Sequence, residues 1–229
     1  MPDVTSAFLS SVGFVEGSLA EVAAEMLAWR TEIGMDSRGR VVNGPLAELV
    51  ARLGPLTTHL RPRELLVEAG AWVAYLDCFV LGSDTSGPVR VLSERLGTRG
   101  VTARCVARRI RIGDVTRLPG TEFSYLGPAP GAGAGERVVR VVAAASSGNG
   151  RWEFHEVGDA LPFEEPQQYR RRRVADRLST DLVVRYCEAL GIRLRDPDGY
   201  GPRGQLFETP HPAVPGMREY PLSSVSTVD

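Results

Sequence analysis

Residues 71–81 read Ala-Trp-Val-Ala-Tyr-Leu-Asp-Cys-Phe-Val-Leu and form the most apolar strand-like run of the chain. Alternate residues of a strand point to opposite faces. Both faces are apolar here: one carries Trp72, Ala74 and Leu76, and the other carries Val73, Tyr75 and Phe79. The pattern predicts a central strand that is covered on both sides.

The segments around this strand predict an α+β fold. Further strands are expected at residues 64–67, 101–107 and 122–126, and residues 138–145 and 151–157 predict a hairpin. Apolar residues three and four apart predict helices at 18–30, 46–53, 89–96 and 180–190. We therefore expect a mixed or mainly antiparallel sheet of five to six strands with flanking helices.

Composition divides the chain into three predicted parts. Residues 1–60 predict a helical N-terminal segment packed on the main body, and residues 61–195 predict an α+β core domain. Residues 196–229 are rich in proline and glycine and predict an extended C-terminal tail.

Charge and composition exclude several kinds of chemistry. All 27 basic residues among the 229 are arginines, so Schiff-base catalysis and the lysine of a phosphate-binding P-loop are excluded. The net charge of −1 argues against general nucleic-acid or membrane binding. Three widely spaced cysteines in apolar runs are typical of buried thiols in a reducing compartment. We expect a cytoplasmic protein without a membrane-spanning segment.

The strand at 151–157 contains the candidate catalytic pair. Trp152 and Phe154 are expected on the core face, while Arg151, Glu153 and His155 share the other face. If that face lines a cleft, Glu153 could orient His155 as a base and Arg151 could bind an anion. Alternatively, the face is solvated and its charges pair across strands, with a contribution from Arg140.

Sequence patterns indicate neither a metal nor a cofactor. His59 and His211 belong to no metal-binding motif. The glycines at 131, 133 and 135 follow prolines and precede a strand, which is the wrong context for a nucleotide loop.

Asp77 is exceptional because it lies within the most apolar strand, where an unpaired carboxylate is costly. It is paired with an arginine, emerges at the strand end where burial stops, or is a perturbed acid near a pocket. Asp84, in the following turn, is expected to stabilise that turn.

Two regions are locally basic. One is the run of Arg170, Arg171, Arg172 and Arg173, and the other lies between residues 99 and 117 and includes Arg108 and Arg109. Some of these arginines are expected to pair with Glu164 and Glu165 and others to face solvent. The remaining charge could bind an acidic protein partner or, less favourably, a nucleic acid.

The leading functional hypothesis is a non-catalytic cytoplasmic protein-binding protein of the inhibitor, immunity or assembly-partner type, acting through its charged patches. The alternative is a small hydrolase-like enzyme with His155 and Glu153 as its acid–base pair and arginines that bind an anionic substrate. A third hypothesis is nucleic-acid binding. Pairing of a sheet edge with a second copy of the chain stays open.

Overall fold

Strand β5 (Trp72–Asp77) lies inside a nine-stranded sheet, between β1 (Ser11–Glu16) and β4 (Arg63–Ala69). All six of its residues are buried, which confirms the prediction of a central, doubly covered strand. The computed structural model describes residues 4–128, 137–211 and 214–228. The glycines at 131, 133 and 135 lie outside the described residues.

The main sheet has the strand order β11-β10-β9-β6-β1-β5-β4-β12-β2, and all its pairings are antiparallel. Its other strands are β2 (Arg38–Asn43), β6 (Gly100–Val106), β9 (Gly120–Pro128), β10 (Arg137–Ser146), β11 (Trp152–Val157) and β12 (Arg203–Glu208). The predicted α+β class is confirmed, and the sheet is larger than the predicted five to six strands.

Within the main sheet, the strands that the sequence did not predict are β1, β2 and β12. Gly13 interrupts β1, and β2 is an exposed edge strand in which only Val42 is buried. Neither shows the apolar alternation that marks a half-buried strand. Strand β12 lies among the prolines and glycines of the C-terminal segment, which hide it.

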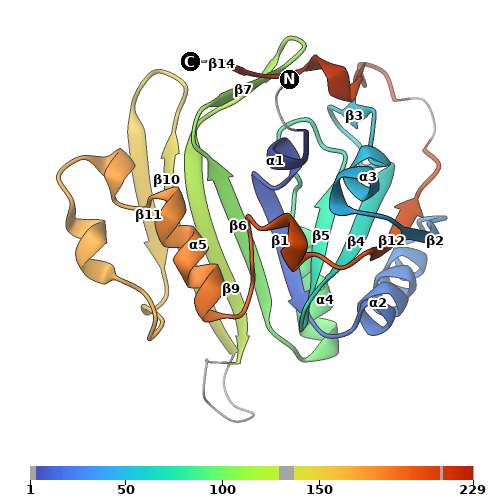
Figure 1. The fold of residues 1–229 in the computed structure, drawn as a ribbon, viewed down its shortest axis with the longest axis horizontal. Helices are drawn as coiled ribbons and strands as arrows, with labels where there is room; N and C mark the ends of the chain where they lie inside the picture. The colour runs from blue at the N-terminus through green and yellow to red at the C-terminus, as the bar shows by residue number, and fades with distance from the viewer. Residues whose placement is uncertain (1–3, 129–136, 212–213, 229) are drawn as a thin grey trace.

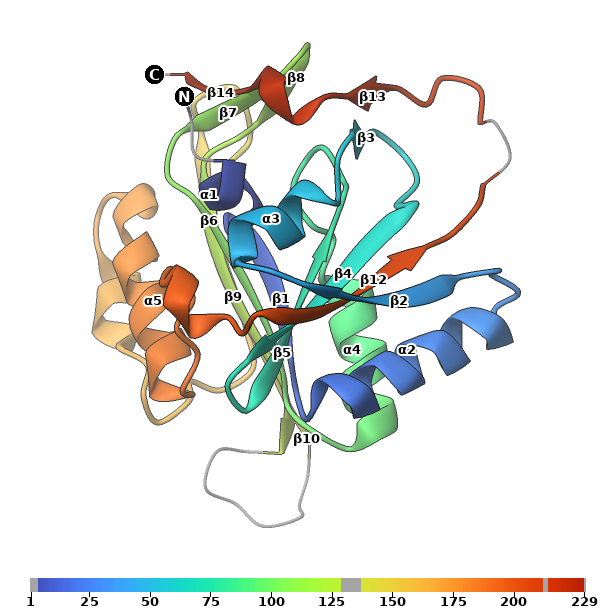
Figure 2. The same cartoon turned by 45° about the vertical axis from the view of Figure 1, so that its right-hand side comes forward.

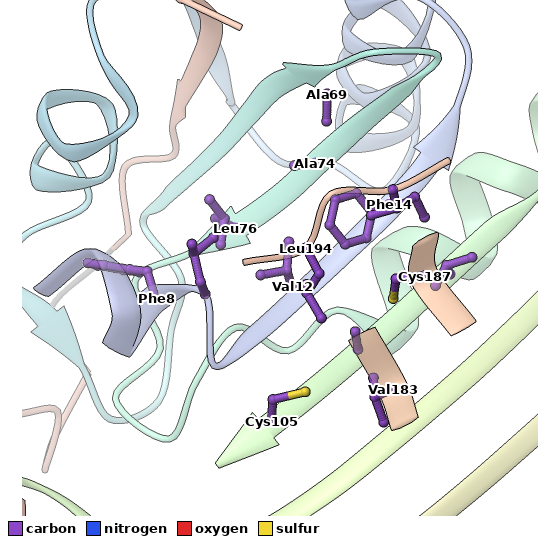
Figure 3. Packing of buried hydrophobic residues seen from close by; sticks show 14 of the residues in the cluster. Phe8, Val12, Phe14, Ala69, Ala74, Leu76, Cys105, Val183, Cys187 and Leu194 are labelled. Carbon is purple, nitrogen blue, oxygen red and sulfur yellow. The ribbon is translucent and has the colours of Figure 1, made fainter. Parts of the chain in front are cut away.

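Helices cover both faces of the sheet (Figures 1 and 2). Residues of α2 (Leu19–Glu32) and α4 (Ser86–Leu96) pack in the smaller apolar cluster on one face. On the other face, α1 (Val4–Phe8), α3 (Leu46–Ala51) and α5 (Thr180–Ala189) contribute to the larger cluster. Figure 3 shows side chains of this larger cluster, among them Phe14 of β1 and Val183 of α5.

The helix α4 connects β5 to β6 by a crossover. Both strands pair antiparallel with β1, so they run parallel to each other with β1 between them. The predicted strand–helix–strand unit is therefore present, but it is split by a strand from the N-terminal segment. This arrangement places the loop between β5 and α4 at one end of β1 and β6.

The two ends of the chain contribute more to the sheet than the sequence predicted. Residues 1–60, predicted as a helical segment, contain β1 and β2 as well as α1, α2 and α3. Residues 196–229, predicted as an extended tail, place β12 between β4 and β2. Within the described residues, no helix is both long and apolar enough to cross a membrane.

The C-terminal residues also complete two small sheets. Strand β14 (Val225–Val228) pairs with β7 (Arg109–Ile112), which pairs in turn with β8 (Val115–Arg117). Strand β13 (Glu219–Tyr220) pairs with β3 (Leu56–Thr57). Short 3-10 helices occur at Pro166–Arg170 (η1), Val174–Asp176 (η2), Pro197–Gly199 (η3) and Leu222–Ser224 (η4).

Gly13 allows α4 to lie directly on β1. A Cβ atom at this position would be 2.4 Å from Cγ2 of Val89 and 2.9 Å from Cβ of Thr85. We expect Gly13→Ala to lower the free energy of unfolding by about 1–3 kcal/mol, because α4 must move outward. Gly87→Ala is the control: Gly87 lies on the exposed side of α4 with no atom near its missing Cβ. Alanine there should change the stability little, because the following Pro88 opposes its helix propensity. Equal unfolding midpoints in urea for the two variants would contradict the close packing.

Candidate functional site

A polar pocket of about 420 Å³ opens where the loop between β5 and α4 meets β6, β8 and β9. We call it the β5–α4 pocket. Its charged lining residues are Asp84, Arg104, Arg117 and Glu122, and its hydroxyl groups come from Ser11, Ser83, Thr85, Ser86, Thr102, Thr116 and Ser146. Phe79, Leu81, Gly82, Ala103 and Leu118 complete the lining. The pocket therefore combines charges of both signs with a partly apolar wall.

Asp77 fixes the loop that forms one side of this pocket. Its Oδ1 accepts a hydrogen bond from the Phe79 amide at 2.8 Å, and its Oδ2 accepts one from the Asp84 amide at 3.0 Å. The Asp77 amide donates to Oγ of Ser83 at 3.0 Å. These three bonds connect both ends of the loop to the last residue of β5, so the side chain of Asp77 organises the turn.

Asp77 is buried in a group of interacting charges. Its Oδ2 lies 3.4 Å from Nε of Arg61, which confirms the predicted pairing with an arginine. Glu64 lies directly opposite Asp77 on β4, and the Tyr75 hydroxyl donates to Glu64 at 2.6 Å. Glu64 is also ion-paired with Arg30. Burial raises the pKa of Asp77 to about 7, and the Phe79 amide and the Arg61 guanidinium oppose this shift only in part.

The raised pKa of Asp77 predicts a pH-dependent stability. The folded protein binds this proton more tightly than the unfolded chain, in which the pKa is near its ordinary value of 3.8. The stabilisation is therefore complete below about pH 4 and is lost as the pH rises to about 7. We expect a slope of up to about 1.4 kcal/mol per pH unit in this window, absent from Asp77→Asn. Urea unfolding of both proteins at pH 5, 6, 7 and 8 measures it, and parallel pH profiles would contradict it.

Arg117 is a buried cation without an ion pair among the described residues. Only 2% of its surface is exposed. Its Nε donates to the Val80 carbonyl at 2.6 Å, and its Nη1 donates to the Ala7 carbonyl at 2.8 Å and to Oγ of Ser10 at 3.3 Å. Burial lowers the pKa of the guanidinium to about 10. The charge of Asp77 opposes this shift in part, while the hydrogen-bond acceptors of Arg117 in the described residues are all uncharged.

Arg104 and Glu122 occupy directly opposite positions on β6 and β9. Nevertheless, no ion pair joins them in the described structure. Nη2 of Arg104 donates to the Leu118 carbonyl at 3.0 Å, and Oε1 of Glu122 accepts from Oγ of Ser124 at 3.3 Å. Both side chains are half-buried and line the pocket, so each presents a charge there.

The predicted acid–base residues lie on the outer strand of the same sheet. Ala143 is opposite both Glu122 and His155, so His155 occupies the same cross-strand row as Glu122 but lies two strands further out. Arg151, Glu153 and His155 are exposed, and Nε of Arg151 lies 4.0 Å from Oε1 of Glu153. None of the three lines the β5–α4 pocket. Their acid–base role stays a prediction that this open position does not favour.

Arg140 does not take part in the cross-strand pairing that was suggested for this face. It lies on the opposite face of β10, where 1% of it is exposed, and its Nη2 is 2.8 Å from Oε2 of Glu164 and 3.1 Å from Oε2 of Glu156. Trp152 and Phe154 pack against the larger core cluster on this side, as predicted.

The basic run Arg170–Arg173 begins at the last residue of η1, ends just before η2 and is exposed. No ion pair joins this run to Glu164 or Glu165 in the described residues, because Glu164 binds Arg140 and Glu165 binds Arg185. The hydrogen bond from Arg185 does most to lower the pKa of Glu165, and the charge of Arg171 contributes. Within the run, the guanidinium of Arg173 lies 4.0 Å from Asp176.

Arg108 and Arg109 are exposed as well. They lie at the start of β7, which belongs to the three-stranded sheet with β8 and β14, whereas the run 170–173 lies next to the 3-10 helices η1 and η2. They line a separate shallow pocket with Ala107, Pro119 and Val228. The structure therefore does not bring the two predicted basic regions together into one site.

Sequence reasoning missed the site formed by Arg104, Arg117 and Glu122. The two arginines were counted only as members of a basic region. Alternation along β6 places Arg104 on the α4 face, and this signal was available. The burial of Arg117 could not be predicted in this way, because β8 has only three residues and is too short to show an alternating pattern.

Comparisons with known proteins add no assignment. No family model, no curated protein and no solved structure matches the chain. Among the described residues, no group of three or more His, Cys, Asp and Glu side chains is arranged to hold a metal ion. The features of the described residues that indicate a function are therefore the β5–α4 pocket and the exposed arginines.

Proposed function

We propose that the chain is a non-catalytic binding protein that holds an anionic group of its ligand in the β5–α4 pocket. The observation that carries the proposal is Arg117, a guanidinium almost fully removed from water whose hydrogen bonds all go to uncharged acceptors. Burying such a charge is costly unless it is paired. The charge of Asp77 favours the guanidinium form of Arg117, but no ion pair joins the two in the described residues. A carboxylate or phosphate oxygen in the pocket would supply a negative charge in direct contact.

The neighbouring groups support binding. Arg104 provides a second guanidinium at the pocket. The hydroxyl of Ser11 donates to the Ser83 carbonyl at 2.7 Å, and the hydroxyl of Ser83 accepts from the Asp77 amide. Both hydroxyl groups thus hold the loop in place, which suits a preformed binding site.

Arg104 is the residue to replace in the first test. It is only half-buried and donates to one backbone carbonyl, so its replacement should disturb the fold little. Thermal unfolding would be followed with sodium acetate or sodium phosphate against sodium chloride at equal ionic strength. We expect both anions to stabilise the wild-type protein by about 1.4 kcal/mol at ten times their dissociation constant. Arg104→Gln should lose most of this stabilisation. Arg111→Gln, an exposed arginine outside the pocket, is the control and should keep it. Equal stabilisation of the two variants would refute the proposal.

A second candidate function is the binding of an acidic protein through Arg170–Arg173. The observation that favours it is that four adjacent arginines are exposed, with one weak ion pair recorded for their side chains in the described structure. Replacement of all four by serine should remove a partner that co-purifies with the wild-type protein. Unchanged co-purifying proteins would exclude this surface, and Arg104→Gln should not affect it.

A further inference from the structure

We infer that the ligand of the β5–α4 pocket is a small zwitterion of the amino-acid type with an apolar side chain. The inference rests on the proposed anion site and extends it. An amino acid carries a carboxylate and an ammonium group a few bonds apart, so its site must offer charges of both signs at close range. The pocket offers them through Arg104, Arg117 and Glu122.

Glu122 is the group that extends the proposal from an anion to a zwitterion. It is half-buried in the pocket wall, and the one hydrogen bond recorded for its carboxylate comes from the Ser124 hydroxyl. Although Arg104 is its direct neighbour across the strands, no ion pair connects the two in the described residues. A carboxylate in this position can accept a hydrogen bond from a ligand ammonium group.

Asp84 does not provide an equivalent site. Its carboxylate is ion-paired with Arg61, and it also accepts a hydrogen bond from the Ser86 hydroxyl at 3.2 Å. Its carboxylate therefore already has a cationic partner within the protein, although Arg61 is shared with Asp77. This assigns the ligand ammonium group to Glu122 and the ligand carboxylate to the two guanidinium groups of Arg104 and Arg117.

The remaining wall of the pocket indicates the kind of side chain. Phe79, Leu81 and Leu118 line it, and 46% of Leu81 is exposed. Covering this apolar surface stabilises a complex by about 25 cal/mol per Å². The volume of about 420 Å³ is large enough for an amino acid with an aromatic or branched aliphatic side chain.

Isothermal titration calorimetry with three related probes tests the inference: L-phenylalanine, N-acetyl-L-phenylalanine and L-phenylalaninamide. N-acetylation removes the ammonium charge, and the amide removes the carboxylate. We expect each change to weaken binding at least about tenfold, because each removes a charge-assisted hydrogen bond. Glu122→Gln should weaken L-phenylalanine about tenfold and leave N-acetyl-L-phenylalanine unchanged. Glu153→Gln, on the exposed outer strand, is the control and should bind as the wild type does.

The outcomes separate this inference from the anion site. Equal affinities for L-phenylalanine and its N-acetyl derivative, with no effect of Glu122→Gln, would overturn the zwitterion and leave the anion site standing. If none of the probes binds and acetate does not stabilise the protein, both the inference and the proposed function are wrong.

Discussion

Arg140→Met should lower the free energy of unfolding by about 3–5 kcal/mol, because it leaves a buried carboxylate without its cation. Both oxygens of Glu164 accept hydrogen bonds from Arg140, and the side chain of Glu164 is fully buried. Methionine fills a similar volume but donates no hydrogen bond. The Tyr169 hydroxyl, which donates to Glu164 at 2.7 Å, cannot supply the missing positive charge.

Urea unfolding measures this loss, and Arg185→Met is the matched control. Arg185 pairs with Glu165, the residue next to Glu164, but its side chain is 52% exposed. An exposed pair contributes about 0.2–1 kcal/mol, so the control should be much closer to the wild type. Similar losses of unfolding free energy in the two variants would contradict the expectation that the buried Arg140–Glu164 pair contributes more to stability than the exposed Arg185–Glu165 pair.

Arg117→Met should cost about 1–3 kcal/mol of unfolding free energy and also abolish anion binding. The variant leaves the buried carbonyl oxygen of Val80 without its donor, whereas the Ala7 carbonyl keeps the hydrogen bond from the Ser10 hydroxyl at 2.7 Å. A buried group without a partner costs about 1–3 kcal/mol. Both effects have one cause, because the same side chain connects α1 to the β5–α4 loop through its hydrogen bonds and lines the pocket.

Arg117→Lys separates charge from hydrogen-bond geometry. A lysine keeps the positive charge, but its single ammonium group cannot reproduce the two directions of a planar guanidinium. We expect partial recovery of stability and weak anion binding, both measured by thermal unfolding with and without acetate. A wild-type unfolding temperature for Arg117→Met would contradict the structural role of this residue.

The sequence predicted the strands and helices that carry a clear apolar period. The central strand β5, the hairpin β10–β11 and the helix predicted at 18–30 are all present, and a Ser18–Glu21 capping box begins that helix. Strands β2 and β12 could not be predicted in the same way. Strand β2 is exposed at the sheet edge, and the buried side chains of β12 are covered by distant segments, Leu206 in the larger apolar cluster and Phe207 in the smaller one. Their place in the sheet depends on distant parts of the chain.

The site was predictable only in part for the same reason. Asp77 is recognisable from the sequence because a carboxylate in an apolar strand needs a partner, and Arg61 provides one. The pocket itself requires β6, β8 and β9 to meet around the β5–α4 loop. No local sequence pattern contains that geometry. The leading functional hypothesis was therefore based on the exposed basic run 170–173 and not on the pocket.

The side-chain nitrogen–proton resonances of Arg104 and Arg117 test the central claim most directly. Their Nε–H signals would be followed in ¹H–¹⁵N spectra while sodium acetate is added, with sodium chloride at equal ionic strength as the reference. If the β5–α4 pocket binds anions, both signals shift with acetate and reach saturation, whereas the signal of exposed Arg111 stays in place. If neither pocket arginine responds, or if chloride shifts them equally, the pocket is not a specific anion site.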